Sequence, residues 1–142
     1  MSSPLFIDTN IPMYAAGQQH PFRSSCVRLL ADIADARVEA VIDTEVVQEV
    51  LYRFGALHHW EIGYQMASNL MILFKDVLPV TVEDMRLAVD LFHRYAPQGI
   101  PARDLIHVAV MQMHSITEVV STDVHFDRIE GLTRIDPLSL YP

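Results

Sequence analysis

The stretch LFID at residues 5–8 decides the fold, because three apolar residues run directly into an aspartate. A short apolar run of this kind is typical of a buried strand. Similar short runs occur at residues 40–42 and 118–121, with further candidates at residues 77–80 and 133–136. Helical patterns alternate with these runs. We therefore predict one α/β domain over residues 1–142, built on a parallel sheet with helices on both faces.

The helices are predicted from apolar residues that recur at spacings of three and four. They begin near Asn10, Pro21, Thr44, His59, Thr81 and Pro101, and Thr-Val-Glu-Asp at residues 81–84 forms a capping-box pattern. The predicted inward faces are Val27, Leu30, Ala31 and Ala34 in the second helix, Ile62, Met66, Leu70 and Leu73 in the fourth, and Met85, Ala88, Val89 and Phe92 in the fifth. The Asp-Pro pair at residues 136–137 is predicted to end regular structure.

The composition limits the partners of the chain. Its 142 residues include 18 acidic and 10 basic side chains, and the formal net charge is −8. This balance argues against sequence-blind adhesion to DNA or to anionic membranes, since such binding needs a basic surface. It does not exclude a nucleic-acid enzyme whose metal ions carry the positive charge.

The chain shows no sign of export or membrane insertion. A single cysteine, Cys26, cannot form an internal disulfide. The first residues lack the basic segment of a signal peptide, and no apolar run approaches 18 residues. We therefore expect a cytoplasmic protein that does not bind membranes.

Four acids stand where a parallel sheet would bring them to one edge. Asp8 and Asp123 follow predicted strands, Glu49 lies one and a half turns into a helix, and Asp104 lies in a first helical turn. Each alone has an ordinary interpretation as a cap, a solvated residue or a partner of the helix dipole. Together they would repel one another, and a divalent cation such as Mg²⁺ or Mn²⁺ offsets that cost. The order of all four therefore predicts a metal site.

Four stretches resemble a known family: FIDTN at residues 6–10, VVQEVL at 46–51, RDLIHVA at 103–109 and STDVHFD at 121–127. They resemble PIN-domain ribonucleases, most of all the VapC-type toxins of toxin–antitoxin pairs. The resemblance implies a five-stranded parallel sheet and a metal site, with Asp8 and Asp104 as direct ligands. It implies the further site residues Glu49 and Asp123 and the supporting residues Thr9, Asn10, Thr122 and Asp127.

The resemblance also implies an activity and partners. The activity is Mg²⁺- or Mn²⁺-dependent hydrolysis of single-stranded RNA or tRNA without a covalent intermediate. The partners are a small antitoxin protein and a second copy of the chain in a homodimer. The apolar helices around residues 51–54 and 66–74 are candidates for those surfaces, or equally for the core.

Other interpretations remain open. A non-catalytic PIN-like domain would bind RNA or protein without cutting it. A receiver or phosphatase-like domain also carries acids after strands, but a dehalogenase-type phosphatase needs a second aspartate where Asn10 stands. His107 and His125 lie near the proposed acids and could contact phosphate or carry a proton, although histidines in such positions more often have only a structural role.

Overall fold

The computed structural model describes residues 3–142 and contains one five-stranded sheet. All the strands are parallel, and their order is β3-β2-β1-β4-β5. This confirms the predicted fold class. The strands are β1 (Leu5–Ile7), β2 (Ala40–Asp43), β3 (Val77–Leu78), β4 (Glu118–Val120) and β5 (Thr133–Ile135).

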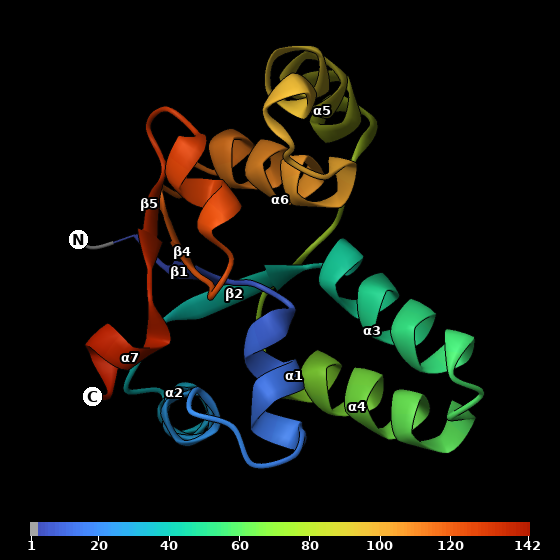
Figure 1. Ribbon diagram of the computed structural model, residues 1–142, viewed down its shortest axis with the longest axis vertical. Helices are drawn as coiled ribbons and strands as arrows, with labels where there is room; N and C mark the ends of the chain where they lie inside the picture. The colour runs from blue at the N-terminus through green and yellow to red at the C-terminus, as the bar shows by residue number, and fades with distance from the viewer. Residues whose placement is uncertain (1–2) are drawn as a thin grey trace.

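Two helices follow each of the first three strands. Figure 1 shows α5 and α6 on one side of the sheet and α1 and α2 on the other, while α3 lies beside α4. The helices are α1 (Asn10–Ala16), α2 (Arg23–Ala34), α3 (Thr44–Ala56), α4 (Trp60–Leu73), α5 (Val82–Tyr95), α6 (Ala102–Met113) and α7 (Pro137–Leu140), with short 3-10 helices η1 (Ala96–Gln98) and η2 (Val124–Arg128).

The strand order reverses between β1 and β4, which are adjacent in the sheet although more than 100 residues separate them. Phe6 pairs with Val119 and Ile7 with Val120, and all four side chains are buried. In an open parallel sheet, ligands bind beyond the carboxyl ends of the strands at such a switch point. Asp8 follows β1 and Asp123 lies just beyond β4, so both stand at this place.

The predicted inward faces of α2 and α5 are partly wrong. In α2 the buried residues include Cys26, Leu29 and Ile33, whereas Val27 is exposed. In α5 the buried apolar residues are Ala88, Leu91 and Tyr95, and three residues predicted to point inward (Met85, Val89 and Phe92) are exposed. Both helices carry apolar residues on two faces, so periodicity alone did not identify the face that packs.

Helix α4 and the C-terminal segment also differ from the prediction. In α4 only Leu70 of the predicted inward face is fully buried, and Ile62 is exposed. The Asp-Pro pair starts α7 rather than ending regular structure, because Asp136 accepts a hydrogen bond from the Leu138 amide and Pro137 occupies the first helical turn. The segment packs on α2, where Ser25 donates to the Tyr141 carbonyl.

The capping box that opens α5 is confirmed. The Thr81 hydroxyl accepts from the Asp84 amide at 3.1 Å, and the Asp84 carboxylate accepts from the Thr81 amide at 2.8 Å. Within residues 3–142, no helix is both long and apolar enough to cross a bilayer.

Candidate active site

Asp8 is held in place at the carboxyl end of β1. Its side chain is buried, and Oδ1 accepts a hydrogen bond from the Thr9 amide at 2.8 Å. Oδ2 accepts from the Ser121 hydroxyl at 2.7 Å and from the Asn10 amide group at 3.1 Å. Burial raises the pKa of Asp8 above its ordinary value, and the charge of His107 and the hydrogen bonds from Ser121 and Thr9 oppose that rise.

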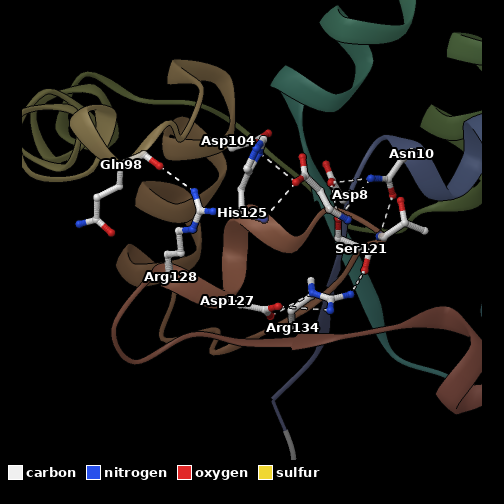
Figure 2. Close-up of polar contacts among 11 residues, drawn as sticks. Asp8, Asn10, Gln98, Asp104, Ser121, His125, Asp127, Arg128 and Arg134 are labelled. Atoms are coloured by element: carbon white, nitrogen blue, oxygen red, sulfur yellow. Dashed lines mark hydrogen bonds and ion pairs between the residues drawn. The ribbon is translucent and has the colours of Figure 1, made fainter.

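Ser121 links the two central strand ends (Figure 2). Its hydroxyl donates to Asp8, and it accepts from the Asn10 amide group at 3.2 Å and from the Asp123 backbone amide at 2.9 Å. The Ser121 hydroxyl therefore uses its one donor and both of its acceptor positions. The sequence reasoning did not single out this serine as a site residue, although it stands in the STD stretch and directly follows β4.

Asp104 approaches Asp8 from the first turn of α6. Carboxylate oxygens of the two residues lie within 4.8 Å of each other, and a second group within the same limit joins Asp104 to Asp123 and His125. Burial, and next the charge of Asp8, raise the pKa of Asp104 to about 7. The charge of His107 opposes this rise without cancelling it, so the repulsion between the carboxylates persists.

Glu49 is buried on the inner side of α3, but its carboxylate is paired with Arg53 one turn later at 2.6 Å. Among the described residues it does not belong to the two groups whose ligand atoms lie within 4.8 Å. The charge of Glu49 nevertheless raises the pKa of Asp8, so the two carboxylates interact electrostatically. The structure thus gathers three of the four predicted acids and leaves Glu49 beside them.

The predicted supporting residues separate into two sets. Asn10 lies within the cluster, and its side-chain oxygen is 3.4 Å from the Thr122 amide. Thr9 is almost fully buried, and its hydroxyl has no hydrogen-bond partner among residues 3–142. Asp127 is exposed and pairs with Arg134 at 3.0 Å, and Arg134 also donates to the Ser121 carbonyl (Figure 2). Asp127 therefore bears on the site only through the backbone that carries Ser121.

Asp43 is the last residue of β2, and Asp8 directly follows β1. Asp43 was not among the predicted site residues, and it caps α3 by accepting from the Val46 amide at 3.0 Å. Its second oxygen lies 2.8 Å from Nδ1 of His107, and both side chains are fully buried. Burial lowers the pKa of His107, but Asp43 and the site acids outweigh it, so the pKa is raised to about 9.

A hollow of about 430 Å³ opens beside the acids. Its lining combines polar residues from the site with two larger side chains of α1: Asn10, Met13, Tyr14, Arg53, Thr122 and Asp123. Arg53 is half exposed there and places a positive charge at the rim. Of the clustered acids, Asp123 is the one in the lining of the hollow.

Comparison with known proteins relates the chain to ribonucleases. The family model described as "PIN domain" matches residues 5–132. Ribonuclease VapC13 of Mycobacterium tuberculosis is 35% identical over 131 residues, which cover 92% of this chain and 98% of that protein.

Solved structures share the fold at lower identity. VapBC2 from Rickettsia felis, bound to a DNA fragment from its promoter, has a TM-score of 0.73 at 18% identity, covering 94% of this chain and 98% of that chain. A toxin-antitoxin complex from Klebsiella pneumoniae has a TM-score of 0.64 at 19% identity, covering 94% and 97%. At these identities the likeness concerns the fold.

Proposed function

Because this chain belongs to the PIN domain family, we propose that it is a metal-dependent endoribonuclease that hydrolyses RNA phosphodiester bonds. The observation that carries the proposal is the convergence of buried Asp8 and Asp104, with Asp123 beside them, at the switch point of the sheet. A ribonuclease relative that spans nearly the whole chain supports RNA as the substrate.

The residues fit a divalent cation. Asp8 and Asp104 are buried together, and burial and the charge of Asp8 raise the pKa of Asp104. Carboxylates are the ligands that Mg²⁺ and Mn²⁺ prefer. When bound, such an ion neutralises the repulsion between the acids and the phosphodiester, and it activates water for hydrolysis.

The surrounding side chains orient these carboxylates. Ser121 and Asn10 fix the Asp8 carboxylate from two directions, and the Ser121 hydroxyl also holds the Asp123 backbone. Asp104 and Asp123 would complete the ion's coordination. Glu49 lies farther from the ion than these acids and would contribute through its charge. Its ion pair with Arg53 offsets part of that negative charge.

The substrate enters through the hollow beside Asp123. Arg53 at its rim offers a cation to a backbone phosphate, and Tyr14 offers a ring on which a base can stack. We also propose that the protein acts on its RNA substrate in the cytoplasm.

The protein is the toxin of a toxin–antitoxin pair and forms a homodimer. An apolar groove of about 600 Å³ between α1, α2 and α4 offers a surface for the antitoxin, with Leu30, Met66 and Leu70 in its walls. The exposed stripe of Val82, Val89 and Phe92 on α5 offers a surface for the second copy. The Klebsiella toxin-antitoxin complex of the same fold supports the first partner.

The decisive experiment is cleavage of single-stranded RNA and tRNA with Mg²⁺ or Mn²⁺, with EDTA and Asp8→Asn as the negative samples. We expect Asp8→Asn to reduce the cleavage rate by roughly 100-fold or more, because it removes a charged ligand while keeping the shape of the side chain. Asp90→Asn is the matched control, since Asp90 is exposed on α5.

Two results would contradict the proposal. Equal cleavage by wild type and Asp8→Asn would exclude the metal site as its source. RNA binding by the folded wild type without cleavage in either metal would instead support a non-catalytic PIN-like domain.

A further inference from the structure

His107 is a fully buried polar residue to which the proposed function assigns no role. It lies on α6, one turn after Asp104, and its side chain is fully enclosed. Its ring packs on Phe6, with centroids 5.3 Å apart. Nδ1 contacts Asp43, whereas Nε2 has no hydrogen-bond partner among residues 3–142. Buried polar atoms without partners are rare, so this nitrogen indicates a missing ligand.

His107 belongs to the same cluster as the site acids. His107 offers a ring nitrogen within 4.8 Å of carboxylate oxygens of Asp8 and Asp104, and Nε2 is the nitrogen that remains free. An ionised Asp43 can only accept a hydrogen bond, so Nδ1 carries a hydrogen. The lone pair that a cation would use is therefore the one on Nε2, once that nitrogen gives up its own proton. Histidines that ligate metals are oriented by a carboxylate in this way.

We propose that His107 Nε2 is a nitrogen ligand of the metal ion held by Asp8 and Asp104, and that Asp43 is the positioning residue that directs its lone pair. The inference rests on the metal site of the proposed function and adds a ligand that the carboxylate set lacks. Asp43 thereby joins the end of β2 to a site otherwise built from the ends of β1 and β4 and from α6.

A nitrogen ligand changes the order of metal preference. Mg²⁺ binds oxygen ligands and gains little from an imidazole, whereas affinity for mixed nitrogen and oxygen sites rises from Mn²⁺ to Co²⁺. We therefore expect the full-length protein to bind Mn²⁺ and Co²⁺ more tightly than Mg²⁺. The excess affinity depends on His107.

Pulsed electron paramagnetic resonance of Mn²⁺ bound to the full-length protein tests this directly. We expect nitrogen modulation in the wild type, shifted when the protein is made with histidine carrying the heavy nitrogen isotope. His107→Gln should abolish the modulation and weaken Mn²⁺ binding roughly 10-fold to 100-fold, with a smaller change for Mg²⁺. His114→Gln, on an exposed residue at the end of the same helix, is the matched control and should retain the modulation.

Asp43→Asn separates a ligand role from a packing role. Asparagine can still cap α3 through its side-chain oxygen. Its amide hydrogens would then face His107 Nδ1, which must accept, so the ring hydrogen moves to Nε2 and blocks the lone pair. We expect a folded protein without nitrogen modulation, even if His107→Gln fails to fold.

The outcomes distinguish this inference from the proposed function. Bound Mn²⁺ without nitrogen modulation in the wild type overturns the His107 assignment, while Asp8-dependent RNA cleavage would leave the nuclease proposal intact. Nitrogen modulation retained in Asp43→Asn overturns the role of Asp43. Failure of the wild type to bind any of these ions would overturn the metal-dependent mechanism itself.

Discussion

At the scale of single residues, the carboxylates of Asp8, Asp104 and Asp123 repel one another, and a bound metal ion would relieve that repulsion. The pKa of Asp104 is raised to about 7, chiefly by burial and by Asp8. A raised carboxyl pKa means that the folded chain binds the proton more tightly than the unfolded chain does. The stability contributed by Asp104 in the metal-free protein therefore falls as the pH rises from about 4 to about 7.

We predict that Asp104→Asn stabilises the metal-free protein at pH 8 by on the order of 2–4 kcal/mol, since one pKa unit corresponds to about 1.4 kcal/mol. Denaturant unfolding in EDTA measures this gain. It should shrink near pH 4.5, where the folded carboxyl is already protonated. A gain of the same size at both pH values would show that packing, rather than charge, is responsible.

His107 adds a pH dependence of the same direction. Its pKa in the folded protein is about 9, above the ordinary value of 6.5. The stability that its protonation contributes is thus complete below about pH 6.5 and lost as the pH rises through 9. We predict that the melting temperature in EDTA declines from pH 7 to pH 9 and that His107→Gln flattens this decline. If the melting temperature of His107→Gln declined as much as that of the wild type, His107 would not be the group responsible.

At the scale of elements, the packing of α3 against α4 includes one close contact between Gly63 and Phe54. A Cβ added at Gly63 of α4 would lie 2.9 Å from the Phe54 Cβ of α3, whereas one added at Gly55 meets nothing within 4 Å. Because α3 carries Glu49 and Arg53, this contact helps to position the outer part of the site.

We predict that Gly63→Ala destabilises the protein by about 1 kcal/mol, because overpacking of about 1–3 kcal/mol exceeds a helix-propensity gain of about 1 kcal/mol. Gly55→Ala is the matched variant and should stabilise by up to about 1 kcal/mol. Thermal or denaturant unfolding of both variants measures the difference. A stabilising Gly63→Ala would show that the two helices separate without cost.

At the scale of the whole molecule, the charge distribution limits how RNA is held. The four proposed site acids would account for half of the net charge of −8. Several arginines are already paired with acids, including Arg53 with Glu49, Arg103 with Glu45 and Arg134 with Asp127. The surface around the site is therefore not broadly basic.

We predict weak RNA binding in EDTA with a shallow dependence on salt, recovered when a divalent ion is added. The slope of log K against log salt should be no steeper than about −2, because each phosphate contact with a single strand contributes about −0.7. Titration of labelled RNA at several salt concentrations measures it. A steep slope in the metal-free protein would reveal a basic surface that the pairing of arginines does not suggest.

The sequence by itself determined the features that depend on neighbouring residues. Apolar runs located the strands, and the Thr81 capping box marked the start of α5, because both signals lie within a few positions. Strand order along the chain also indicated that acids after β1 and β4 would approach one edge. The catalytic role of those acids remains a prediction.

Only the tertiary structure decided how the elements meet. It selected the packed faces of α2 and α5, which local periodicity could not distinguish because each helix has apolar residues on two sides. It also brought Ser121 to Asp8 and His107 to Asp43, pairs separated by 113 and 64 positions. Such contacts depend on sheet order and helix packing, and no local spacing encodes them.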